Sequence, residues 1–136
     1  MRAHGAIALL VLLAACHDGS SSPTAPLAST TIDHGRLAGV VTIGPNCPVE
    51  TASPCATPPG AYALRKVLVM NEAGTELLHT VDIDSQGAYL IDLPPARYTV
   101  DVKKAGIDRV SGVPAVVEIK ANTVTKLDIS IDTGLR

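Results

Sequence analysis

The sequence has 136 residues, which is enough for one domain. Its formal net charge is −2, and its only aromatic residues are three tyrosines, because tryptophan and phenylalanine are absent. Nucleic-acid-binding proteins use a basic surface and stacking aromatic side chains, so this composition excludes nucleic acid as an expected partner. A hydrophobic core in this chain must be built mainly from valine, leucine and isoleucine.

The N-terminus has the features of an export signal. Residues 1–4 form a short, positively charged segment, and Gly5–Ala15 is an apolar run of signal-peptide length. That run is too short to span a bilayer, which needs about 20 residues. The stretch Leu13-Ala14-Ala15-Cys16 resembles the lipobox of bacterial lipoproteins. The resemblance implies that residues 1–15 are a signal peptide and that Cys16 becomes the lipid-modified first residue; an ordinary secretory signal cleaved near Ala15 is the alternative.

Residues 16–34 have the composition of a tether. They are rich in serine, proline, threonine and alanine, which predicts a flexible linker between a membrane anchor and a domain. Acyl chains on Cys16 would hold the protein durably, since each buried methylene contributes about 0.8 kcal/mol. We therefore expect an exported protein that is lipid-anchored to the bacterial membrane. The residue after the cysteine is His17 rather than aspartate, which resembles outer-membrane sorting if the cell is Gram-negative.

A predicted strand and a long loop follow the tether. Leu37–Ile43 is rich in β-forming residues, whereas Gly44–Gly60 is rich in proline, glycine and asparagine and shows no apolar period. The loop contains Cys47 and Cys55, the two cysteines that remain if Cys16 is acylated. An exported protein meets an oxidising compartment, so we predict a disulfide between them. A metal clip and a redox pair are the alternatives, but the spacing is not CxxC and no histidine lies nearby.

This loop is also a candidate interaction surface. A disulfide would keep it rigid where a short hairpin would be enough to connect two strands. The residues that would offer contacts to a partner are Asn46, Pro48, Val49 and Glu50.

Two further strands are predicted between residues 61 and 83. Ala61–Met70 is mostly apolar apart from Arg65-Lys66, which suggests burial on both faces. After a turn, Glu76–Ile83 alternates between apolar and polar residues. His79 falls on the apolar face, and we expect it to be a hydrogen-bonded core or rim residue rather than a metal ligand. The apolar residues on that face are Leu77, Val81 and Ile83.

The clearest alternation lies between residues 84 and 102. Gly87 can adopt the positive φ of a tight turn, and two alternating segments follow it. Pro94-Pro95 separates them, because proline cannot donate ladder hydrogen bonds. We interpret the two segments as an antiparallel pair with one dry face. The residues predicted on that face are Tyr89, Ile91 and Leu93 in the first segment, and Tyr98, Val100 and Val102 in the second.

The last third of the chain predicts two more strands. Val113–Lys120 and Thr123–Ile131 alternate, and Gly106–Gly112 is expected to be a polar connection. Short strands separated by turns at intervals of about 8–12 residues are typical of an all-β sandwich. We therefore predict a seven-stranded antiparallel β-sandwich over residues 35–136, with a small closed barrel as the alternative.

The central stretch also resembles a known family. Asp84 followed by Gly87-Ala88-Tyr89, and then Leu93-Pro94-Pro95-Ala96-Arg97-Tyr98, is similar to the carboxypeptidase regulatory-like domain, with Ala96 in place of its usual glycine. Gly39-Val40-Val41 fits the opening strand of that domain. The resemblance implies a prealbumin-like (transthyretin-like) seven-stranded sandwich with Greek-key connections. It also implies an accessory, adhesive or structural role.

One prealbumin-like branch is enzymatic, the 5-hydroxyisourate hydrolases. Those proteins end in Tyr-Arg-Gly-Ser, whereas this sequence ends in Thr133-Gly134-Leu135-Arg136. We therefore do not predict that activity for this sequence.

The sequence offers little that resembles a catalytic or metal site. Asp82-x-Asp84-x-Gln86-Gly87 is similar to the opening of an EF-hand loop, but Leu93 stands where the bidentate glutamate is needed. We expect a solvated turn there, and a weak calcium contact at Asp82 and Asp84 stays open. There is no nucleophile elbow and no phosphate-binding glycine loop. The histidines outside the signal peptide are far apart: His17, His34 and His79.

These observations predict a non-catalytic envelope module without a cofactor or metal. Its partner would be an envelope protein, bound through the loop that contains Cys47 and Cys55 or through an exposed edge strand. An accessory carbohydrate- or polymer-binding module is the alternative, although sugar sites usually need exposed aromatic side chains. A transthyretin-like hydrolase is the third interpretation.

Overall fold

The computed structural model describes residues 33–48 and 55–135. These residues contain no helix, so nothing in them could cross a membrane as a helix. The all-β prediction is confirmed, but the described residues form nine strands where the sequence predicted seven. The strands are β1 (Gly35–Gly44), β2 (Lys66–Met70), β3 (Leu77–Asp82), β4 (Ala88–Leu93), β5 (Ala96–Lys103), β6 (Arg109–Ser111), β7 (Ala115–Ile119), β8 (Val124–Lys126) and β9 (Ile129–Asp132).

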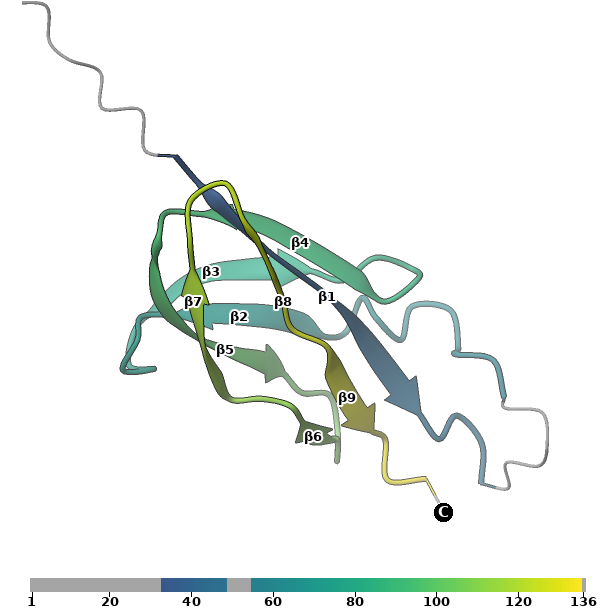
Figure 1. The fold of residues 1–136 in the computed structure, drawn as a ribbon. Coiled ribbons are helices and arrows are strands. Elements are labelled where there is room, and N and C mark those ends of the chain that lie inside the picture. Colours follow the sequence, from purple (N-terminus) through teal and green to yellow (C-terminus); the bar gives the residue numbers. More distant parts are fainter. Residues whose placement is uncertain (1–32, 49–54, 136) are drawn as a thin grey trace, which may run out of the picture. The chain divides into compact units, whose positions relative to one another are not determined.

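The strands form two sheets (Figure 1). The first sheet has the order β4-β1-β9-β6, with β8 also paired to β1, and the second has the order β3-β2-β5-β7. Strand β1 is antiparallel to β4 but parallel to β8 and β9. The prediction of a purely antiparallel sandwich is therefore wrong at β1. The chain changes sheets several times after β4, and its last strands reach β1 running in the same direction.

The core lies between the sheets and is filled by their inward-facing residues. Buried and more exposed residues alternate along β1, β2 and β5, as expected for strands with one face on a core. Each fully buried aliphatic side chain contributes about 1.5–3 kcal/mol to folding. The core is mainly aliphatic, as predicted, and consists of Leu37, Val41, Ile43, Val67, Val69, Val81, Ile83, Tyr89, Leu93, Tyr98, Val100, Val102, Ile119, Ile129 and Ile131.

Strands β4 and β5 do not pair with each other. The faces predicted to be dry are mostly buried, but β4 lies in the first sheet and β5 in the second. Pro94-Pro95 carries the chain across the sandwich, and the Tyr98 hydroxyl donates a hydrogen bond to the Pro94 carbonyl, 2.9 Å away. The predicted antiparallel pair is wrong, because both apolar faces point into the same core from opposite sheets.

The last predicted strand is interrupted at residues 127 and 128. The Leu127 N–H donates to the Ala38 carbonyl, and the Leu127 carbonyl accepts a 2.6 Å hydrogen bond from the Tyr89 hydroxyl. Burial raises the pKa of that hydroxyl to about 12. The backbones approach so closely that a Cβ on Gly39 would lie 1.8 Å from the Leu127 carbonyl oxygen. The break between β8 and β9 is therefore a packed contact that requires glycine at position 39.

Three smaller predictions differ from the structure. Residues 61–64 form turns rather than a strand, and the expected polar connection contains β6. His79 and Leu77 are exposed, so the placement of His79 on the inner face is wrong. An irregularity in the pairing of β2 with β3 shifts the register between Val69 and Met70. The alternation of β3 is lost there, and within β3 only Val81 is buried.

Candidate functional site

The loop after β1 is closed by the predicted disulfide. Cys47 and Cys55 are joined with an S–S distance of 2.02 Å and a Cα–Cα distance of 6.1 Å, which confirms the pairing. Of the candidate contact residues, Pro48 is exposed. Val49 and Glu50 lie outside the described residues, as does the predicted lipidation site Cys16.

The side chain of Asn46 closes the base of this loop. Its side-chain amide donates to the Ile43 carbonyl at 3.1 Å and to the Cys55 carbonyl at 3.2 Å. The Thr133 hydroxyl donates to the Pro45 carbonyl and ties the same region to the segment after β9. The side chain of Asn46 is therefore used within the loop, and its role as a contact residue stays a prediction.

A buried ion pair that the sequence analysis missed lies between Arg65 and Asp108. The guanidinium donates two hydrogen bonds to the carboxylate, both 2.7 Å long, and a third to the Ala61 carbonyl. The Ala105 N–H also donates to the carboxylate. The hydrogen bond from Arg65 lowers the pKa of Asp108 below its usual range, although burial opposes this shift. Both oxygens of this carboxylate accept hydrogen bonds, so the pair joins the loop before β2 to the loop before β6.

The acidic turn before β4 is also used structurally. One Asp84 carboxylate oxygen accepts hydrogen bonds from the Gln86 and Ala88 N–H groups at 2.8 and 2.9 Å. Asp82 forms an ion pair with Lys66. Among residues 33–48 and 55–135, no group of three or more histidine, cysteine, aspartate or glutamate side chains could hold a metal ion. The structure therefore adds nothing in support of calcium binding at this turn.

The outer face of the first sheet carries an apolar hollow of about 640 Å³. The side chains of even-numbered residues in β1 and β4 point outward, and the small residues Ala38 and Ala88 leave space between larger neighbours. Those neighbours are Val40, Leu90 and Val124, which are 43%, 53% and 62% exposed. We call the surface formed by Ala38, Val40, Ala88, Leu90 and Val124 the outer-face hollow.

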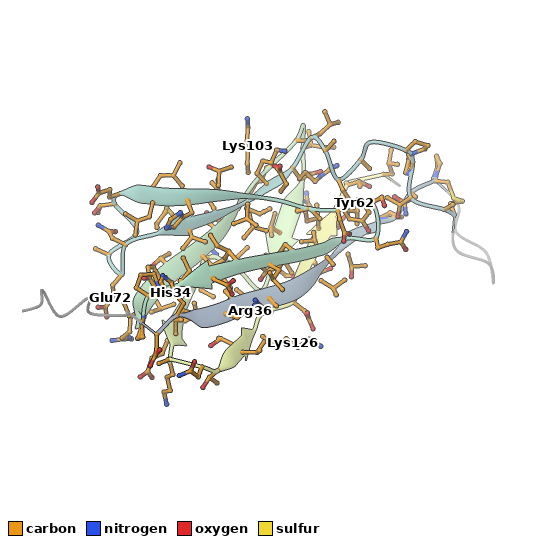
Figure 2. All side chains as sticks on the ribbon, turned by 90° about the horizontal axis from the view of Figure 1, so that it is seen from above. His34, Arg36, Tyr62, Glu72, Lys103 and Lys126 are labelled. Carbon is orange, nitrogen blue, oxygen red and sulfur yellow. A yellow bond between two sulfur atoms is a disulfide. The ribbon has the colours of Figure 1, made fainter. Side chains whose placement is uncertain are left out.

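Charged groups surround the outer-face hollow. Asp82, Asp84 and Lys126 line it, and the exposed Arg36–Asp92 ion pair lies on the same face of β1 and β4. Figure 2 labels Arg36 and Lys126 on this sheet. An apolar patch bordered by charges is typical of a surface that contacts another molecule.

The hollow adjoins β4, which is an edge strand, and the hydrogen bonds show which of its residues face outward. The Gly87 carbonyl accepts from the Val41 N–H and so points toward β1, whereas Ala88 exchanges hydrogen bonds with Asp84 and so points away from it. Backbone direction alternates along an antiparallel strand. The N–H and carbonyl groups of Leu90 and Asp92 therefore point away from β1, to the open edge.

The other edges of the two sheets are better protected in the described part of the chain. β3 carries the pairing irregularity, β6 has three residues, and the Glu118 carbonyl of β7 accepts a hydrogen bond from the Thr125 hydroxyl. Bulges, short strands and coverage all hinder strand addition. β4 pairs regularly with β1 over six residues and contains neither lysine nor proline. It is the least protected edge among the described strands.

The three tyrosines do not form an exposed platform. Tyr89 and Tyr98 are 4% and 6% exposed, and Tyr62 packs partly buried against the core. Because these are all the aromatic residues of the chain, no aromatic side chain is fully exposed to stack on a sugar ring.

No protein-family model and no curated protein matches the sequence. Among solved structures, it is similar to GBS52, the minor pilin of the Gram-positive pathogen Streptococcus agalactiae, with 12% identity, a TM-score of 0.50, and coverage of 74% of this chain and 44% of that chain. The Bacillus anthracis TIE protein has 16% identity and a TM-score of 0.46, with coverage of 74% and 16%. A DUF3823 family protein from Parabacteroides merdae has 12% identity and a TM-score of 0.43, with coverage of 72% and 45%.

The chain spans less than half the length of each of these proteins. The similarity to the minor pilin supports an all-β domain of two sheets that resembles pilin domains. At 12% identity it shows the fold alone.

Proposed function

We propose that this chain is a non-catalytic, lipid-anchored interaction module of the bacterial cell envelope that binds an extended polypeptide segment along β4. The observation that carries the proposal is the open β4 edge beside the outer-face hollow. The lipobox-like residues before Cys16 support anchoring to the membrane. The resemblance of residues 84–100 to the carboxypeptidase regulatory-like domain, and the pilin-like fold, agree with a structural or adhesive role.

Strand addition fits the groups that β4 offers. The outward N–H and carbonyl groups of Leu90 and Asp92 would form ladder hydrogen bonds with an added strand, which give affinity. Alternate side chains of that strand would lie on the outer face next to Leu90, where the hollow accepts apolar groups. This mode needs no reactive side chain, and it uses the longest regularly paired edge among the strands that the structure describes.

The other two interpretations have less support. A carbohydrate module would stack sugar rings on aromatic side chains, and here the three tyrosines are buried or partly buried. A hydrolase would need titratable groups that are free to act on a substrate. The most buried ones, Arg65 and Asp108, already bind each other.

The contact surface can be tested in whole envelopes. We would replace Leu90 with a photo-reactive phenylalanine analogue in the full-length protein and irradiate whole envelopes. We expect a discrete cross-linked adduct from position 90. The control is the same replacement at Val116, which is 50% exposed on the outer face of the second sheet. Equal adducts from both positions, or none from position 90, would contradict binding along β4.

The anchor needs a separate test. We expect metabolic labelling with a fatty acid to mark the native protein, and Cys16→Ala to lose both the label and membrane association. Retention of the label in Cys16→Ala would contradict lipidation at this residue.

A further inference from the structure

The outward-facing residues of β4 limit which segment can pair with it. Within β4, Leu90 and Asp92 present open backbone groups, whereas the N–H and carbonyl of Ala88 are bound to Asp84. The edge therefore offers two residues, Leu90 and Asp92, to an added strand, and a second β4 offers the same two residues in return. We propose that the segment that pairs with β4 is β4 of a second copy of this chain. This inference rests on the proposed function, because it names the partner of the same edge.

One register satisfies both copies. If a two-fold axis passes through Ile91, Leu90 of each copy lies opposite Asp92 of the second copy, and each of these pairs exchanges two hydrogen bonds. All the open groups of Leu90 and Asp92 are then used. An axis through Leu90 would place Asp92 opposite Ala88, whose backbone groups are already occupied. The backbone geometry therefore selects a single antiparallel, isologous arrangement.

The side chains agree with this register. Each Asp92 would lie beside the apolar Leu90 of the second copy, and Arg36 of its own chain already binds its carboxylate at 2.7 Å. No unpaired like charges would face each other, and β4 contains no lysine. On the inner side, the two partly buried Ile91 side chains would meet at the axis. Continuing the first sheet into a second copy thus joins the two Ile91 side chains on the inner side, places each Asp92 beside a Leu90 on the outer face, and leaves both ion pairs intact.

The contact between the two β4 strands is small, and its size determines the conditions under which it forms. Pairing over three residues buries less than the approximately 1,200–2,000 Å² of specific, stable interfaces. We therefore expect the pair to dissociate in dilute solution and to form when both copies are confined to one membrane, where the effective concentration is high. The experiment must use the full-length, anchored protein.

Cysteine cross-linking tests the register directly. In the non-hydrogen-bonded pair at the axis, the two Ile91 Cα atoms would be about 4.5 Å apart, within the range that a disulfide bridges. We expect Ile91→Cys, oxidised mildly in intact envelopes, to give a covalent dimer of twice the monomer mass. The matched control is Val116→Cys, which is exposed on the other sheet and should remain monomeric.

A proline distinguishes strand pairing from random collision. In the Ile91→Cys background, Leu90→Pro removes an N–H that points away from β1, so the ladder between β1 and β4 is kept while the edge is blocked. We expect loss of the dimer in this variant and its retention in Leu90→Ala, which keeps the N–H. Asp92→Pro removes the second outward N–H and replaces Leu90→Pro if that variant does not fold.

The outcomes separate this inference from the proposed function. A dimer that is lost on proline substitution supports both. Cross-links from positions 90 and 91 only to a different protein overturn self-pairing and leave binding along β4 intact. A complete absence of cross-links at both positions overturns both proposals. Equal dimer formation by Ile91→Cys and Val116→Cys overturns self-pairing, because collision would explain it.

Discussion

Two arginine–aspartate pairs in this domain have nearly the same geometry and very different surroundings. The Arg36–Asp92 hydrogen bonds are 2.7 and 3.1 Å long, and those of Arg65–Asp108 are both 2.7 Å. The side chains of the first pair are 47% and 52% exposed, whereas those of the second are 8% and 2% exposed. The first pair joins β1 to β4 on the outer face, and the second joins two loops at the end where β1 finishes.

The geometry of an ion pair alone does not set its contribution to stability. Water already solvates Arg36 and Asp92 and screens them, so their attraction adds little to folding. Arg65 and Asp108 have lost that water, and each depends on the other for compensation of its charge. Removing one partner should therefore lower the free energy of unfolding strongly at the buried pair and hardly at all at the exposed pair.

The largest effect is expected from Asp108→Asn. This change leaves the buried Arg65 charge without a counter-charge, which we expect to lower the free energy of unfolding by about 3 kcal/mol. Urea unfolding of the domain measures it, with Asp92→Asn as the matched control. Similar losses in the two variants would show that burial does not distinguish the energetic roles of the two pairs.

Acid should reduce the difference in the free energy of unfolding between the native protein and Asp108→Asn. The pKa of Asp108 is lowered in the folded state by Arg65, so its contribution is present above the unfolded pKa of about 3.9 and is lost as the pH falls through the folded pKa. We expect a constant stability gap near neutral pH that narrows below about pH 4. Unfolding series at several pH values test this. A gap that stays constant down to pH 2 would argue against the ion pair as its origin.

A smaller effect is expected when both partners are replaced. Arg65→Met combined with Asp108→Leu removes both charges and keeps apolar volume in the site. We expect this double variant to be about 1–2 kcal/mol more stable than Asp108→Asn, since no unpaired charge stays buried. Full recovery is not expected, because the Ala61 carbonyl and the Ala105 N–H lose their partners. A double variant less stable than the single one would mean that the pair stabilises the loops beyond charge compensation.

The smallest effect is expected from Arg36→Ala. Both partners of this pair are solvated, so we expect the unfolding midpoint to stay close to that of the native protein. Added salt should remove any difference that is seen at low ionic strength. A clear loss of stability that persists at high salt would show that the arginine stem, rather than its charge, holds β1 to β4.

The residues of these two pairs also show which features of the fold could be predicted from the sequence and which could not. Alternation predicted the buried faces of the segments that became β4 and β5, because a strand with one dry face leaves that period in its own residues. It could not predict their partners, because a two-proline link permits either a hairpin or a crossing to the other sheet. In the sequence, Arg65 is visible only as a polar interruption of an apolar stretch. Its partner Asp108 lies 43 residues away and left no local signal.

The candidate site also contains features that could be predicted from the sequence and features that could not. The disulfide between Cys47 and Cys55 was predictable, because few cysteines were left to pair. The hydrogen bonds of Asn46 and the edge position of β4 were not, since the first depend on three carbonyl and hydroxyl acceptors that the fold brings together and the second on the order of strands in a sheet. Edge position is a property of topology, which no single segment contains.

The parallel pairing of β1 with β9 has a consequence for how the domain is completed. Val41 lies opposite Ile129 and Gly44 opposite Asp132, so the first strand of the domain depends on the last. Closing such a distant contact is entropically costly, and domains dominated by contacts of this kind fold slowly. A growing chain cannot complete its first sheet until residue 132 is available. Completion of that sheet is therefore a late step of folding, because it waits for the strand that lies farthest from β1 in the sequence.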